Sequence, residues 1–356
     1  MKYAMASKLR TAAFAGLIIG VCAFVIAVAA GLLYEQAQRG RDRKLFPQIG
    51  RSTDIGGRML NIYCSGAGQP AVIFESGAPW PTMSDPKMMW EHGAPRPGFS
   101  WVRIQAELAK ITTACWYDRA GSGWSDLGPY PRDSASQARD LHALLEAARV
   151  SPPYVLVAES SATLDARVYA ASFPGEVAGL VFVNGVHPDL LRKIRPDGGR
   201  TDALPEFVFH SQDEMAQLGN RVGLYRLGLP KRPTPAPLPD GITPSEWNTI
   251  WHLTRSAKAR SALLQEIAAW ERSTAEARAA GTLGDRPLIV LGGENAALPL
   301  KYRNVWTELQ TDLARLSARG KLMALPESGE DLIYRAPHAI AEATRQIVED
   351  IRPGKR

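Results

Sequence analysis

The chain has 356 residues, of which 45% are hydrophobic, and it carries a formal net charge of +6. This length and composition suffice for one large domain with an insertion, and they argue against intrinsic disorder. The positive charge is mild, and no Lys/Arg-rich run interleaved with aromatic residues accompanies it, so we expect no nucleic-acid partner. The three cysteines show no metal-site spacing, and we expect no metal or other cofactor.

The first feature in chain order, after a short flank at residues 1–11, is an apolar segment at residues 12–34 without a charged side chain. A helix of this length crosses the ~30 Å hydrocarbon layer of a membrane, which predicts a transmembrane helix with the lipid membrane as its partner. A cleaved signal peptide is the alternative, because Ala27-Val28-Ala29 is typical of a cleavage site. The apolar stretch exceeds the usual ~7–15 residues of a signal peptide, however, which favours an uncleaved anchor. Its orientation stays open because basic residues lie on both sides: Lys2, Lys8 and Arg10 before it, and Arg39, Arg41, Arg43 and Lys44 after it.

After a basic linker at residues 35–49, strand and helix patterns alternate, which predicts a parallel sheet flanked by helices. Residues 188–285 interrupt this alternation and contain a proline-rich patch, so we predict a lid insertion there. The insertion divides a core into a first part at 50–187 and a second part at 286–356. The expected strands are a hairpin around Gly56-Gly57 and the segments 71–77, 112–118, 154–157, 178–184, 286–291 and 321–325; the expected helices are 101–110, 134–148, 305–319 and 336–351, with one more after residue 160.

The segment from Tyr154 to Ala170 predicts a buried strand, a sharp turn and a helix. Four apolar residues follow the pair Pro152-Pro153, and helical spacing of apolar residues resumes at Leu164. The turn between them is Ala158-Glu-Ser-Ser-Ala162. Small residues two before and two after a central serine are what a nucleophile elbow requires, because strand and helix approach closely there. Ser160 is therefore the candidate nucleophile.

Two of the three cysteines, Cys64 and Cys115, each lie near the end of a predicted strand. They can pair if the two strands are neighbours and the domain faces an oxidising compartment. Free cysteine is often buried as a small hydrophobic residue. From the sequence we favour this second interpretation, in which the two cysteines are buried and unpaired.

Several motifs together resemble the α/β-hydrolase superfamily, specifically its bacterial membrane-anchored, esterase-like members. The most specific is Tyr117-Asp-Arg-Ala-Gly-Ser-Gly-Trp-Ser-Asp126, which Phe74-Glu-Ser-Gly77 precedes and His187-Pro-Asp189 and Ser328-Gly329 follow. The resemblance implies a mostly parallel eight-stranded sheet flanked by helices, a helical lid insertion, and one N-terminal transmembrane helix. It also implies the bacterial inner (cytoplasmic) membrane as the location.

The resemblance further implies a serine at the elbow, an acid after one of two later strands, and a histidine after the last strand. Ser160 occupies the nucleophile position, but Glu330 stands where the histidine is expected. Asn184 and Asn295 stand at the two acid positions. The histidine position and both acid positions are thus changed together, while the serine and the motifs around these positions persist.

These changes matter because the serine hydroxyl needs a base to remove its proton. Imidazole, with a pKa of ~6.5, accepts and returns a proton near neutral pH. A glutamate has a pKa of ~4.3, so Glu330 would need strong desolvation to act as a base. Glu159, beside Ser160, opposes a developing oxyanion by roughly 2–3 kcal/mol at ~6–8 Å in an effective dielectric of ~20. The backbone N–H groups of Ala78 and Ser161 remain the candidate oxyanion donors.

Two function classes follow. The first is a non-catalytic binding or accessory subunit of a membrane protein complex, with a small ester-like or hydrophobic ligand in the old pocket. The alternative is an active ester or amide hydrolase, or a lyase-like relative, in which Glu330 assists Ser160, with Glu159 as a second carboxylate. Asp118 and Arg119 are expected to hold their loop by hydrogen bonds rather than take part in chemistry. We expect a structural role for Glu75.

Overall fold

The computed structural model describes residues 2–78, 95–194, 206–224, 226, 238, 242–293, 300–325 and 332–352. The chain divides into two compact units. The smaller unit comprises residues 1–47 and 211–233, and the larger one comprises 48–210 and 234–356. The smaller unit contains α1 (Lys2–Leu45), which continues to Leu45 within the segment 35–49 that was predicted as a linker. An Arg39–Glu35 ion pair one turn apart supports this extension of the helix.

The larger unit is built on one eight-stranded sheet in the order β1-β2-β4-β3-β5-β6-β7-β8. The β1–β2 and β2–β4 pairs are antiparallel and all later pairs are parallel. The predicted sheet is therefore confirmed, and so is the predicted hairpin, which forms the first two strands of the sheet. The strands are β1 (Arg51–Asp54), β2 (Met59–Ser65), β3 (Ala71–Ser76), β4 (Ala114–Tyr117), β5 (Tyr154–Glu159), β6 (Val177–Val183), β7 (Leu288–Gly293) and β8 (Gly320–Leu325).

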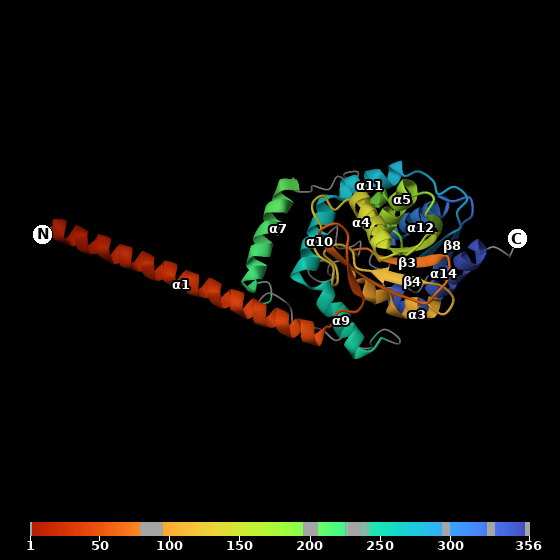
Figure 1. Ribbon diagram of the computed structural model, residues 1–356. Helices are drawn as coiled ribbons and strands as arrows, with labels where there is room; N and C mark the ends of the chain where they lie inside the picture. Colours follow the sequence, from red (N-terminus) through yellow and green to blue (C-terminus); the bar gives the residue numbers. More distant parts are fainter. Residues whose placement is uncertain are drawn as a thin grey trace. The chain divides into compact units, whose positions relative to one another are not determined.

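Helices cover both faces of this sheet (Figure 1). One face carries α3 (Val102–Leu108) and α14 (Pro337–Ile351), and the other carries α4 (Ser134–Ala147), α5 (Ala162–Ser172), α11 (Trp270–Ala279) and α12 (Leu300–Ala314). Strand residues alternate between the two cores: Leu156 of β5 packs on the α4/α5 side, and Val155 and Val157 pack on the α3/α14 side. The remaining helical segments are η2 (Gly98–Trp101), α6 (Leu190–Ile194), α7 (Glu206–Arg221), α9 (Pro244–Thr254), α10 (Ala257–Ala268) and α13 (Leu332–Arg335).

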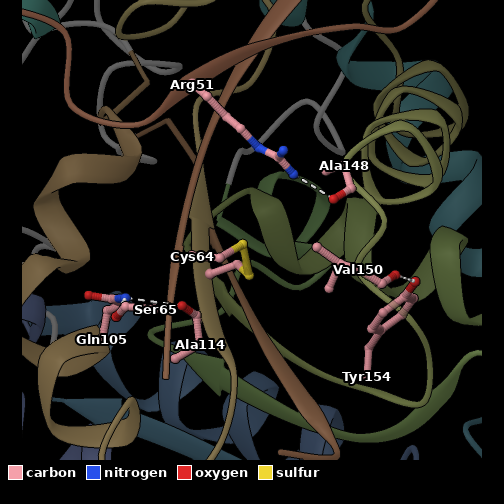
Figure 2. Close-up of a disulfide and its surroundings, with 9 residues drawn as sticks. Arg51, Cys64, Ser65, Gln105, Ala114, Ala148, Val150 and Tyr154 are labelled. Atoms are coloured by element: carbon pink, nitrogen blue, oxygen red, sulfur yellow. Dashed lines mark hydrogen bonds between the residues drawn. A yellow bond between two sulfur atoms is a disulfide. The ribbon is translucent and has the colours of Figure 1, made fainter. Parts of the chain in front are cut away.

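A disulfide joins β2 to β4 in the larger unit (Figure 2). The antiparallel register sets Cys64 directly opposite Cys115, with 4.1 Å between their Cα atoms. The interpretation that we favoured from sequence, two separate buried thiols, is therefore wrong. The pairing depends on the strand order, in which β4 lies between β2 and β3.

As predicted, the Asp118 side chain holds the loop that follows β4. Its carboxylate is buried and accepts hydrogen bonds from the backbone N–H groups of Gly98 (2.7 Å) and Trp124 (2.9 Å) and from the Asn61 side chain (2.9 Å). Arg119 differs from the prediction, because its guanidinium leaves the loop and bonds to carboxylates on two helices.

Candidate active site

Ser160 lies in the turn between β5 and α5 with φ +54°, a left-handed conformation that residues other than glycine rarely adopt. Two backbone hydrogen bonds hold it there. Its N–H donates to the Val183 carbonyl (3.1 Å), and its carbonyl accepts from the Val186 N–H (3.1 Å). The neighbouring strand β6 and the loop after it therefore impose the strained turn that a nucleophile elbow requires.

The loop after β3 packs directly on the elbow at Gly77. The Gly77 N–H donates to the Glu159 carbonyl (3.0 Å). A Cβ atom at position 77 would lie 2.6 Å from the backbone nitrogens of both Ser161 and Ala162, so only glycine fits. This close approach brings Ala78 against the elbow.

Ala78 engages the hydroxyl groups of both elbow serines. The Ser160 Oγ donates to the Ala78 carbonyl at 2.8 Å, and the Ala78 N–H donates to the Ser161 Oγ at 2.9 Å. The first bond directs the proton of the candidate nucleophile at a carbonyl, which is not a base. The second occupies an N–H that was expected to stabilise an oxyanion. In this arrangement neither the nucleophile nor the Ala78 donor is poised for acyl transfer.

Helix α10 covers this point of the elbow. Ala78 is buried in a small apolar cluster with Ala259 and Leu263 of α10, and the half-buried Ile267 packs against it. Helix α10 belongs to the stretch 188–285 in which the sequence predicts a lid. Ser160 itself is only 7% exposed.

Glu159, the carboxylate beside the candidate nucleophile, is buried and paired. Its Oε1 lies 3.2 Å from Nη1 of Arg96, which is itself largely buried. The Arg96 guanidinium also lies 5.4 Å from the ring centroid of Tyr334 in α13. The uncompensated negative charge that we expected beside Ser160 is therefore offset. No signal in the sequence pointed to Arg96 as the partner of Glu159. Arg96 lies far from Glu159 in the chain, before β4, and it belongs to no recognised motif.

The sheet brings one of the two acid positions next to the elbow. Asn184 directly follows β6, and the last residues of β5 and β6 are paired neighbours (Glu159 with Val183). Asn184 is buried with φ +50°, and its N–H donates to the Leu291 carbonyl at 2.7 Å. Position 184 thus presents an amide at the carboxyl end of the sheet. Glu330 and Asn295, the other two candidate positions, lie outside the described residues.

Three of the histidines contact other parts of the chain. The ring Nδ1 of His187 accepts the backbone N–H of Asp189 at 3.1 Å, and burial lowers the pKa of His187 to about 4. This imidazole is neutral at pH 7, in agreement with a structural role. The rings of His142 and His338 each contact a glutamate, at 3.2 Å and 2.9 Å.

A cluster of buried charges lies beneath the elbow helix. Arg119 donates to Asp165 of α5 at 2.6 Å and to Glu266 of α10 at 2.8 and 2.9 Å, and Tyr117 donates to Glu75 of β3 at 2.7 Å. Burial raises the pKa of Asp165 to about 6 and that of Glu75 to about 8. A cavity of about 20 Å³, roughly the volume for one water, is lined in part by Arg119, Asp165 and Glu266. The cluster ties α10 to α5 and thereby to the elbow.

Three curated proteins share partial sequence similarity with this chain. "Uncharacterized protein YbdG" of Bacillus subtilis is 23% identical over 164 residues, 46% of each protein. "AB hydrolase superfamily protein" of Gibberella zeae is 32% identical over 123 residues, 33% of this chain and 38% of that one. "Uncharacterized vacuolar membrane protein YNL115C" of Saccharomyces cerevisiae is 33% identical over 112 residues, 30% of this chain and 17% of that one. The chain thus spans less than half the length of each of these relatives.

Solved structures share the fold. The haloalkane dehalogenase DbeA of Bradyrhizobium elkani superposes with a TM-score of 0.57 at 18% identity, covering 85% of this chain and 97% of that one. The serine hydrolase CarC, involved in carbazole degradation, superposes with a TM-score of 0.54 at 15% identity, covering 85% and 98%. A model of the alpha/beta hydrolase family matches residues 88–343. With this match over most of its length, the chain belongs to the alpha/beta hydrolase family.

Proposed function

We propose that this chain is a membrane-anchored α/β-hydrolase-fold protein that has lost serine-hydrolase chemistry and serves as a non-catalytic binding or accessory subunit of a membrane assembly. The observation that carries the proposal is the double engagement of Ala78. The Ser160 proton is donated to a carbonyl, and the Ala78 donor is occupied by the neighbouring hydroxyl. Both features oppose the attack of Ser160 on a carbonyl and the stabilisation of the resulting oxyanion.

The residues at the other catalytic positions support the same proposal. Asn184 provides an amide where the family has an acid, and an amide cannot stabilise an imidazolium by charge. Glu330 provides a carboxylate where the family has its imidazole base. Each change alone removes part of the proton relay, and the two together leave it without its usual base and orienting acid.

The proposed anchor is α1. Its residues 13–27 are all exposed, and the helix from Ala13 to Leu45 is long and apolar enough to cross a bilayer. The disulfide between β2 and β4 supports a soluble unit on the oxidising side, which for a bacterial inner membrane is the periplasmic face. Protease added to spheroplasts should then degrade the soluble unit, and protection of that unit would assign it to the cytoplasm.

A fluorophosphonate label tests the loss of activity, because it reacts with an activated serine. We expect the purified full chain to incorporate no more label than its Ser160→Ala variant. Label on the wild-type chain that disappears in Ser160→Ala would refute the proposal. A combined Asn184→Asp, Ser161→Ala and Glu330→His variant supplies the positive arm, because it restores the acid and the histidine and frees the Ala78 N–H. We expect this variant to gain labelling that the same variant with Ser160→Ala lacks.

The accessory role is tested separately by purification in mild detergent. We expect a membrane protein to co-purify with the full chain in stoichiometric amount. A chain that always emerges alone, with membrane complexes unchanged after its deletion, would contradict an accessory role.

One observation favours the alternative, an active hydrolase. Ser160 retains the strained left-handed conformation of a nucleophile elbow, and such strain is commonly kept at functional sites. If Glu330 is the base, hydrolysis of a nitrophenyl ester should be lost both in Ser160→Ala and in Glu330→Gln. Turnover unaffected by either substitution would exclude this mechanism.

A further inference from the structure

In the smaller unit, the described side chains of α7 from residue 211 onward are polar where they are buried, and the large apolar ones are exposed. Asp213 and Asn220 are only 1% and 9% exposed, whereas Met215 and Leu218 are 73% and 62% exposed. Leu224, just after the helix, is 59% exposed. Surface helices in water have the opposite arrangement, because their apolar stripe faces the core. The exposed side of α7 is therefore suited to an apolar surrounding.

The turn that follows α7 packs on α1 within this unit. A Cβ atom on Gly31 of α1 would lie 2.5 Å from the Val222 carbonyl oxygen, and one on Gly223 would lie 3.0 Å from the Tyr34 ring. The two backbones are thus in close contact at glycines. Covered positions recur along α1 at residues 28, 31, 35, 38 and 42, the spacing of one helix face.

A partly buried group of ion pairs holds the same contact. Arg226 Nε lies 2.6 Å from Glu35 Oε2, and Arg226 Nη2 lies 2.7 Å from Asp42 Oδ2. The contact between the two segments thus combines glycine packing with ion pairs, while exposed apolar side chains lie beside it. Leu32, Leu33 and Tyr34 on α1 are exposed in the same unit as Leu224.

The position of this contact along α1 sets its depth in a membrane. Gly31 lies three residues before Tyr34, the end of the apolar segment, which corresponds to about 5 Å along the helix axis. The turn at 222–224 then lies at the boundary of the hydrocarbon layer, and the ion pairs of Arg226 lie just outside it. Interfacial amphipathic helices bury their apolar side about 5–10 Å into this boundary.

Exposed charges flank the apolar surface on its outer side. Glu214 and Arg221 lie at one edge of the exposed side of α7, and α1 continues past the apolar segment with exposed basic residues: Arg39, Arg41, Arg43 and Lys44. Basic residues next to a membrane-spanning segment attract anionic lipid headgroups, by about 1 kcal/mol for each residue. The charge pattern thus fits an anionic bilayer surface better than bulk water.

We infer that residues 211–224 form a second membrane contact beside α1, with Met215, Leu218 and Leu224 inserted into the interfacial layer of an anionic bilayer. This inference rests on the proposed transmembrane anchor. It adds a membrane contact that comes from within the insertion at 188–285.

Quenching by lipids with brominated tails tests the inference on the full chain, reconstituted in vesicles of phosphatidylethanolamine and phosphatidylglycerol. A fluorescent maleimide is attached to Leu218→Cys in a Cys22→Ser background, and Met215→Cys provides a second labelling site. Phe24→Cys, in the middle of the apolar segment, reports on the anchor. Glu342→Cys, at a half-exposed position of α14 in the larger unit where the side chain is 45% exposed, is the matched control for labels in water.

We expect quenching at positions 24, 218 and 215 and none at 342. Quenching at 24 without quenching at 218 and 215 would overturn the inference and leave the anchor intact. Absence of quenching at 24 would overturn the anchor and the inference with it. If the labels at 218 and 215 are unquenched, and the unlabelled cysteines at these positions form a disulfide between two copies of the chain on oxidation, the apolar side belongs to a protein contact and the inference is wrong.

Discussion

Replacing Glu75 with glutamine should make the stability of the protein less dependent on pH. Glu75 is buried on β3, and its carboxyl accepts a hydrogen bond from the Tyr117 hydroxyl. Burial, reinforced by the nearby Asp165 carboxylate, raises the pKa of Glu75 from 4.5 to about 8. Glutamine has nearly the same shape and can accept the same hydrogen bond, but it cannot ionise.

The sign and size of the effect follow from the pKa of Glu75 in the folded and unfolded chains. The folded state binds the proton more tightly, so the stability contributed below about pH 4.5 is lost as pH rises to about 8. Each pKa unit corresponds to about 1.4 kcal/mol, so the total loss is on the order of 5 kcal/mol. About half of it, roughly 2 kcal/mol, falls between pH 6 and pH 8. The Glu75→Gln variant should escape this loss.

Urea unfolding of the full chain in mild detergent, followed by tryptophan fluorescence at pH 6 and pH 8, measures the difference. We expect the advantage of Glu75→Gln over wild type in unfolding free energy to grow by about 2 kcal/mol between the two pH values. Glu146→Gln, at an exposed position of α4, is the matched control and should show no such growth. An advantage of Glu75→Gln that is equal at both pH values would refute the assignment of a raised pKa.

Three further substitutions test the contacts around the elbow and in the sheet. Gly77→Ala places a Cβ 2.5 Å from a backbone oxygen, so we expect a loss of about 2 kcal/mol or more in unfolding free energy; an unchanged melting temperature would contradict the close approach. Arg119→Met leaves two carboxylates buried without their cation and should lower the unfolding free energy by about 3–5 kcal/mol. The loss should be smaller at acidic pH, where the carboxylates become protonated. Equal losses at pH 5 and pH 8 would contradict the ion cluster. Replacing both Cys64 and Cys115 with alanine opens a loop with a sequence separation of 51 and should cost about 4 kcal/mol. Mass spectrometry showing a free thiol at both of these positions in the native chain would contradict the disulfide.

The sequence alone was enough to predict the alternation of strands and helices, the sheet, and the position of Ser160 at a turn after β5. These features depend on local properties: apolar runs of strand length, helical spacing, and small residues around a sharp turn. The loop role of Asp118 was predictable in part, because its partner Trp124 lies in the same loop, whereas its partners Gly98 and Asn61 come from distant segments. The substituted positions 184, 295 and 330 were visible because family motifs mark them.

Only the tertiary structure decided how the groups at the site are engaged. The hydrogen bonds of Ala78 to the two elbow serines, the ion pair of Glu159 with Arg96, and the pairing of Cys64 with its partner each join segments from different strands or loops. Such contacts depend on strand order and on the close approach at a glycine, neither of which local periodicity encodes. For the same reason the apolar residues of α7 became informative only once their exposure was known, because a sequence shows which residues are apolar but not which side of a helix is covered.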